Sequence, residues 1–372
     1  MHVALSTPSL NKFESSTSWT NWNSVDDYKL ADINADGKND ILGYSKEKLK
    51  IELSNGVNSF TISTWLASQY DIQFYIDRVD TYIDGVDTGP ILNLTDHITE
   101  LCKESRDNIT DIEAPAAQYI KGVFEGLGYS VTTEEVKFEE YNYAPWVYNI
   151  IATKPGSEYP NSYIEFTAHY DTSAVNLLPT EKLQGAKDNA SGVASVLEIA
   201  RILFHYDNKH SMRFIAFASE EKFKFYTGSR IHVDKSKELE ENILGLNIDT
   251  TGTATDDYEY VTTWYRGVAS YEMSNLLSTL SKTYSIPIEI VSENIGIDCQ
   301  SDELAYYNQG LAAITSLGDW RNSHYHEPTP VDDDETTSVD ERTLGDSVLS
   351  LYVENVRRVC KANLAVGIAL DN

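Results

Sequence analysis

The spacing of apolar positions separates a β-rich start of the chain from a longer part in which helices and strands alternate. Residues 192–204 carry apolar side chains at offsets of three, four and seven, which predicts one buried helical face. Residues 114–127 also predict a helix. Short apolar runs predict buried strands at 163–168, 213–218, 243–248 and 311–317. Strands that alternate with helices predict an α/β fold with buried central strands.

Residues 1–68 contain an internal repeat. The pattern at Val3–Ser6 recurs at Ile51–Ser54, and each copy is followed by a phenylalanine and a tryptophan. A period of about 46–48 residues with short alternating strands is typical of propeller-type β repeats. We therefore predict a small all-β region over 1–68, a connector over 69–95 and a second domain over 96–372.

An acidic loop inside this β region has the spacing of a calcium site. Oxygen-bearing residues occupy loop positions 1, 3, 5, 7 and 9, with the backbone carbonyl at position 7: Asp32, Asn34, Asp36, Lys38 and Asp40. Gly43 stands where an EF-hand needs a glutamate, so the loop resembles the aspartate-rich turn of FG-GAP/VCBS-type repeats. One structural Ca²⁺ is the expectation, and an ordinary acidic turn without an ion is the alternative.

Composition narrows the range of partners. The chain has 29 Lys and Arg against 58 Asp and Glu, a formal charge of −29. This excess disfavours nucleic acid and anionic membranes as partners.

No apolar run approaches the roughly 18 residues of a membrane span, and no signal peptide is recognisable. Three widely spaced cysteines without a CxxC pair argue against a thiolate zinc site. The oligomeric state stays open.

Potential metal ligands follow the predicted strands one after another. They are His169 with Asp171, Asp188 in a glycine-flanked turn, Glu220 with Glu221, Asp249, and finally His324 with His326. Open α/β sheets gather their sites at these carboxyl ends. Buried carboxylates repel one another unless cations neutralise them. Imidazole and carboxylate donors suit catalytic zinc, although cobalt and manganese fit too. A carboxylate that is not a ligand must accept the proton of the attacking water.

A set of motifs carries a family resemblance. The motifs are Ala168–Asp171, Gly185–Gly192, Glu220–Glu221, Gly228–Arg230, Asn247–Asp249, Ser301–Asp302 and Tyr325–His326. Together they resemble the co-catalytic dizinc aminopeptidases of the bacterial leucyl aminopeptidase type, from about residue 95 to the C-terminus. The resemblance implies a mixed, mostly parallel central sheet flanked by helices, of phosphorylase/hydrolase-like fold, and makes 96–372 a dizinc peptidase domain.

The resemblance also assigns roles. His169 and Asp249 would complete one zinc site, and Glu221 and His326 the other. Asp188 would bridge the two ions. His326 is preferred over His324 because Glu327 and Pro328 follow it, as turn residues follow the last histidine of the family.

Three further roles come from the same resemblance. Glu220 would be the general base and acid. Asp171 would hydrogen-bond to His169 and fix its tautomer. Tyr325 would stabilise the tetrahedral oxyanion, and a packing role is the alternative.

The function implied is a metal-dependent exopeptidase that removes the N-terminal residue of peptides with a dizinc-bound hydroxide. The acidity, the repeat and the family together predict a secreted or periplasmic protein. Three alternatives stay open: a glutaminyl cyclase-type zinc enzyme, a carboxypeptidase that uses Arg266 or Arg321, and an adhesion module with an inactive peptidase domain. The chain departs from the family at Glu303, where histidine is common, and in a longer loop at 222–227.

Overall fold

The computed structural model divides the chain into two compact units, residues 1–78 and 79–372. In the first unit the structure describes the strands given below and Arg78. In the second it describes residues 79–87, 93–104, 106, 114–136, 147–172, 184–221, 226–253, 261–292, 301–318 and 351–371.

The first unit is built from antiparallel strands. Its hairpin joins β1 (Ser6–Thr7) to β2 (Leu10–Phe13). A four-stranded sheet follows in chain order, with β3 (Asp27–Ala31), β4 (Asp40–Tyr44), β5 (Leu49–Ser54) and β6 (Ser59–Thr61). Asp40 begins β4, whereas Asp32, Asn34, Asp36 and Lys38 lie outside the described residues. The calcium site therefore stays a prediction.

The second unit is organised around an eight-stranded sheet in the order β13-β12-β14-β11-β9-β10-β8-β7. The strands are β7 (Ser130–Val136), β8 (Val147–Lys154), β9 (Tyr159–His169), β10 (His210–Phe217), β11 (Asn242–Ile248), β12 (Val261–Tyr265), β13 (Ile288–Ser292) and β14 (Ala313–Leu317). Strands β10, β9, β11 and β14 are mutually parallel. The neighbouring pairs β10–β8, β8–β7 and β12–β14 are antiparallel. The carboxyl ends of four neighbouring strands therefore meet at one edge.

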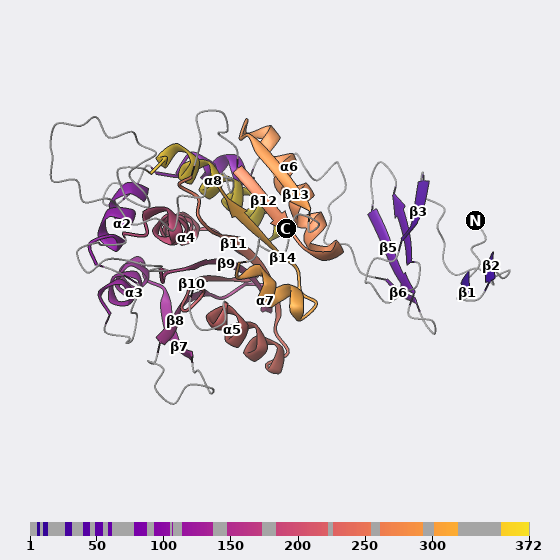
Figure 1. Cartoon of the computed structure of the whole chain (residues 1–372), viewed down its shortest axis with the longest axis horizontal. Coiled ribbons are helices and arrows are strands. Elements are labelled where there is room, and N and C mark those ends of the chain that lie inside the picture. The colour runs from indigo at the N-terminus through magenta and orange to yellow at the C-terminus, as the bar shows by residue number, and fades with distance from the viewer. Residues whose placement is uncertain are drawn as a thin grey trace. The chain divides into compact units, whose positions relative to one another are not determined.

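Helices cover both faces of this sheet (Figure 1). The helices are α2 (Leu94–Leu101), α3 (Pro115–Leu127), α4 (Ser191–Leu203), α5 (Thr227–Glu238), α6 (Gly267–Thr283), α7 (Glu303–Asn308) and α8 (Val353–Leu370). Helices α3, α4, α6 and α8 pack on one face, with α2 against α4, and α5 and α7 pack on the other. The arrangement confirms the predicted α/β class with a mixed, mostly parallel sheet.

Close packing in the centre of the sheet holds the site-bearing strands. Phe166 of β9 stacks on Phe214 of β10, with ring centroids 5.4 Å apart. Helix α8 passes so close that a Cβ at Gly367 would lie 2.2 Å from the Phe166 ring. Such dense packing leaves little freedom to the strand ends. Among the described residues, no helix combines the length and apolarity that crossing a membrane requires.

Candidate metal centre

The predicted ligands lie where the parallel strands end. His169 is the last residue of β9, and Asp249 directly follows β11. Glu220 and Glu221 follow β10 after Ser219, whose φ of 61° turns the chain sharply. Asp188 lies in an irregular turn, Ala186–Ala190, that leads into α4. The sheet edge thus collects side chains from four separate segments.

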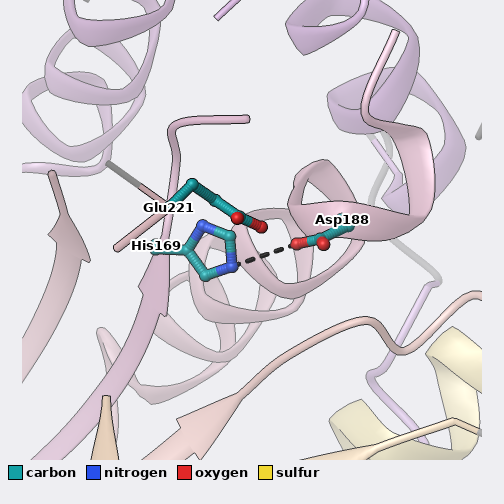
Figure 2. Close-up of side chains that lie close together, drawn as sticks. All are labelled: His169, Asp188 and Glu221. Atoms are coloured by element: carbon teal, nitrogen blue, oxygen red, sulfur yellow. Dashed lines mark ion pairs between the residues drawn. The ribbon is translucent and has the colours of Figure 1, made fainter. Parts of the chain in front are cut away.

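Three of these side chains converge closely enough to hold one ion. Ligand atoms of His169, Asp188 and Glu221 all lie within 4.8 Å of one another. Figure 2 shows the three side chains directed toward a common point, with His169 on its strand and Asp188 on the turn before a helix. The His169 Nε2 atom is 3.1 Å from Asp188 Oδ1 and 3.3 Å from Asp249 Oδ1.

The geometry around His169 fits a metal cation. Its Nδ1 lies 3.2 Å from the Asp171 carbonyl oxygen and 3.5 Å from Asp171 Oδ1, so a hydrogen on Nδ1 is donated there. Nε2 then carries a lone pair, and it faces two carboxylates. A neutral imidazole cannot satisfy both, but a cation among the three groups can. Nitrogen and carboxylate donors without thiolate suit zinc.

Asp171 also fixes the neighbouring glutamate pair, a contact that the sequence analysis did not foresee. Its Oδ1 accepts the Glu220 backbone N–H and its Oδ2 the Glu221 backbone N–H, both at 3.1 Å. The buried carboxylate is thereby tied to the chain that presents both glutamates. Consecutive side chains leave such a backbone in different directions, so one glutamate can bind a metal while the other handles a proton.

The pKa values reflect the concentration of negative charge. Burial raises the pKa of Glu220 well above its ordinary value, and the charges of Glu221 and Asp249 raise it further against the opposing effect of His169. Burial disfavours the charged form of His169, but Asp249 and Glu220 outweigh burial and raise its pKa. Divalent cations would relieve this repulsion.

Asn189 and Gly192 hold the turn that carries Asp188. The Asn189 amide donates to the Ile248 carbonyl at 2.9 Å and accepts the Gly192 N–H at 2.9 Å. A Cβ at Gly192 would lie 2.3 Å from the Ile248 oxygen. Only glycine lets α4 start this close to the end of β11. The turn that carries Asp188 therefore lies beside the end of the strand that Asp249 follows.

Arg106 is a site-shaping residue that sequence reasoning missed. Its buried guanidinium donates to four backbone carbonyls: Tyr170 at 2.9 Å, Leu101 at 2.8 Å, Gln184 at 2.9 Å and Gly185 at 2.5 Å. It therefore joins the segment after His169 to the segment before Asp188. A lone arginine among polar residues carries no sequence signal of such a burial.

The structure brings together six of the eight predicted catalytic and metal-site residues. These are His169, Asp171, Asp188, Glu220, Glu221 and Asp249. Tyr325 and His326, and the alternative ligand His324, lie outside the described residues. Their roles stay predictions.

A sheet edge with imidazole, clustered carboxylates and a separate buried glutamate defines a metal-dependent hydrolase site. Residues 149–349, just over half of the chain, match Peptidase family M28. The chain belongs to this family, which confirms the predicted enzyme class at the level of a zinc metallopeptidase.

The curated relatives resemble this chain over only part of its length. The chain is 30% identical over 249 residues to the uncharacterized protein YfbL of Escherichia coli, with 60% of this chain and 75% of that protein aligned. It is 26% identical to a probable zinc metalloprotease of Pyrenophora tritici-repentis (59% and 42% aligned). It is 30% identical to the aminopeptidase YwaD of Bacillus subtilis (56% and 45% aligned). The chain thus spans less than half of the last two proteins.

Solved structures show the same fold in enzymes of two kinds. An aminopeptidase from Aneurinibacillus sp. strain AM-1 superposes with a TM-score of 0.58 at 15% identity, over 77% of this chain and 95% of that one. A glutaminyl cyclase of Fimbriiglobus ruber superposes with a TM-score of 0.58 at 18% identity, over 77% and 97%. The fold alone does not decide between the two reactions.

Proposed function

We propose that this chain is a dizinc aminopeptidase that removes the N-terminal residue of peptides. The observation that carries the proposal is the approach of two carboxylates, Asp188 and Asp249, to a single nitrogen of His169. In this proposal, His169, Asp188 and Asp249 would hold one ion, and Asp188, Glu221 and His326 would hold a second.

Two zinc ions would supply Lewis acidity, which polarises the peptide carbonyl and makes water acidic enough to attack near neutral pH. Asp171, through its bonds to the backbone of Glu220 and Glu221, keeps the base and the ligand in separate positions. Tyr325 is proposed to donate a hydrogen bond to the developing oxyanion.

Glu220 is proposed to move the proton. The residue is only 6% exposed, and burial favours the protonated form of its carboxyl group. It takes the proton from the attacking water and delivers it to the leaving amine. A carboxyl group shielded from bulk water can serve both halves of this transfer.

The substrate is proposed to be a peptide with a free N-terminus. The site is rich in carboxylates, which attract the α-ammonium group. A carboxypeptidase would need an uncompensated cation for the terminal carboxylate. Arg266 lies 3.3 Å from the buried carboxylate of Glu303, so its charge is compensated, and Arg321 lies outside the described residues. This disfavours Arg266 as a carboxylate-binding residue.

Zinc analysis combined with a panel of aminoacyl chromogenic substrates and unblocked peptides tests the proposal. We expect two zinc ions per chain, release of the N-terminal amino acid, and loss of activity after chelation that added zinc restores. One zinc ion together with cyclisation of N-terminal glutamine would favour the glutaminyl cyclase reaction instead. Activity that survives complete removal of metal would exclude the dizinc proposal.

We also propose that the loop from Asp32 to Asp40 binds one structural Ca²⁺ and that the protein acts outside the cytoplasm. The alternating oxygen ligands support the first statement, and the acidity of the chain supports the second. Calcium should raise the melting temperature of the full chain, and Asp36→Asn should remove that increase. An equal increase in both proteins would reject the loop as the binding site.

A further inference from the structure

The carboxylate of Asp249 is held on both oxygens by hydroxyl groups. Ser301 Oγ donates to Asp249 Oδ2 at 2.7 Å, and Thr250 Oγ1 donates to Oδ1 at 2.9 Å. The Oδ1 atom is also the one that lies near His169 Nε2. Ser301 therefore holds the far oxygen and turns the near one toward the metal position.

The direction of the Ser301 hydrogen bond is set by Asn247. The side-chain oxygen of Asn247 accepts from Thr167 Oγ1 at 2.9 Å, and its side-chain nitrogen donates to Ser301 Oγ at 2.9 Å. Because the Ser301 oxygen already accepts this hydrogen, its own hydrogen is available to Asp249. The network thus makes Ser301 a donor to the carboxylate.

Glu303 anchors the segment that carries Ser301. Its carboxylate is buried and accepts the Ser301 N–H at 3.1 Å and the Thr315 hydroxyl at 2.7 Å. The Arg266 guanidinium lies 3.3 Å from its other oxygen. Burial raises the pKa of Glu303 to about 7, while Thr315 and Arg266 oppose the increase. Donors on both oxygens match a carboxylate.

These contacts join three elements around the ligand. Arg266 precedes α6, Glu303 begins α7, and Thr315 lies on β14 beside β11, which ends at Asp249. A histidine in place of Glu303 could not accept from Ser301, Thr315 and Arg266 at once, whereas the glutamate accepts from all three.

We propose that Glu303, anchored by Arg266, is a positioning residue that sets the orientation of Asp249 through Ser301. Glu303 does not itself contact the metal position. It holds the Ser301 backbone, the Ser301 hydroxyl holds Asp249 Oδ2, and Oδ1 is left to bind metal. The inference rests on the proposed function only in taking Asp249 as a metal ligand.

Zinc affinity of the full chain, measured by competition with a chromogenic chelator, tests this inference. Asp249→Ala first identifies the ion that depends on Asp249. In Glu303→Gln, one oxygen can still accept from Ser301 and Thr315, but an amide N–H then faces the Arg266 guanidinium and the anchor is lost. We expect the Asp249-dependent ion to bind up to about 100-fold more weakly, because losing a direct partner of a ligand, here Ser301, costs about 10- to 100-fold. The other ion should be unaffected.

A matched control is Glu165→Gln. Glu165 is equally buried and pairs with Arg213 at 3.0 Å and with the Tyr306 hydroxyl of α7 at 2.6 Å. It therefore supports α7 without any contact to Ser301. Glu165→Gln should lower the melting temperature and leave both zinc affinities unchanged. An equal loss of zinc affinity in both variants would mean that any disturbance of α7 weakens zinc binding, and it would overturn the inference.

A double-mutant cycle with Ser301→Ala supplies the second readout. If Glu303 acts through Ser301, Glu303→Gln should have little further effect on zinc affinity in the Ser301→Ala background. Full additivity, or unchanged affinity in Glu303→Gln alone, would refute the inference. Because the assay reads zinc and not peptide cleavage, a protein that binds zinc but cleaves no peptide would reject the proposed function and leave this inference standing.

Discussion

Two buried histidines of the same unit differ in how carboxylates are arranged around their ring nitrogens. His169, at the metal centre, has Asp188 and Asp249 both beside Nε2. His232 of α5 has Glu134 3.3 Å from Nδ1 and Glu165 3.1 Å from Nε2, one carboxylate for each nitrogen. Both rings are almost fully buried.

The difference lies in how hydrogens are shared. A protonated imidazole has two N–H groups, so His232 satisfies Glu134 and Glu165 fully as an imidazolium. Burial opposes this charge, but the two glutamates raise the pKa of His232 to about 9. At His169 two carboxylates compete for one nitrogen, and protonation cannot serve both. Two acids on one nitrogen fit a cation-binding site, whereas one acid on each nitrogen fits a structural ion pair.

The largest effect is expected from Glu220→Gln. This variant keeps the shape of the side chain but cannot accept the proton of the attacking water. We expect kcat to fall by about 10²- to 10⁴-fold, with zinc content near that of the wild type. Loss of zinc together with activity would make Glu220 a ligand. Glu165→Gln, in the His232 network, serves as the control and should retain kcat.

A direct test of the comparison is the pair His169→Gln and His232→Gln. Losing an outer-shell partner lowers zinc affinity by about 10- to 100-fold, and losing a ligand should lower it further. His169→Gln should therefore lose zinc in a chelator titration. His232→Gln should bind zinc normally, because its carboxylates surround no metal position. Zinc loss in the His232 variant would erase the distinction between the two histidines.

The pH dependence of stability should reveal the His232 ion pair. Its pKa is raised in the folded protein from 6.5 to about 9, so its stabilisation is complete below about pH 6.5 and is lost as the pH rises through 9. At about 1.4 kcal/mol per pKa unit, the loss amounts to about 3 kcal/mol. Urea unfolding between pH 6 and 10 should show a decrease that His232→Gln lacks. Parallel curves for the two proteins would contradict the assignment.

The smallest effect is expected at the rim of the same network. Lys235 Nζ lies 3.1 Å from Glu134 Oε1, but the lysine side chain is 57% exposed. Solvent-exposed pairs contribute up to about 1 kcal/mol. Lys235→Ala should therefore lower the free energy of unfolding by less than about 1 kcal/mol in urea denaturation. A loss comparable to that in His232→Gln would show that the cation, and not the histidine, carries the network.

Sequence patterns predicted the centre of the fold better than its margins. Strands β9, β10, β11 and β14 are buried apolar runs, and α4 repeats its apolar positions clearly. Strand β12 (Val261–Tyr265) contains two buried threonines, and only two of the seven residues of β7 are buried. Such strands depend on neighbours far along the chain, so periodicity does not reveal them.

The candidate site divides in the same way. His169, Glu221 and Asp249 follow predicted strands and Asp188 precedes a predicted helix, so their convergence at the carboxyl ends of the strands could be expected. Arg106 and Glu303 act through backbone carbonyls, hydroxyls and N–H groups whose positions depend on the finished tertiary structure. The residue types of these supporting side chains could not reveal their partners in advance.

His169 and Asp249 stand 80 positions apart, and Asp188 comes from a turn between them. Contacts of such high sequence separation form late in folding. A nascent or partly unfolded chain thus holds no chelating cage, and zinc capture is coupled to completion of the sheet. Zinc binding can therefore be used as a measure of how much of the protein has folded correctly.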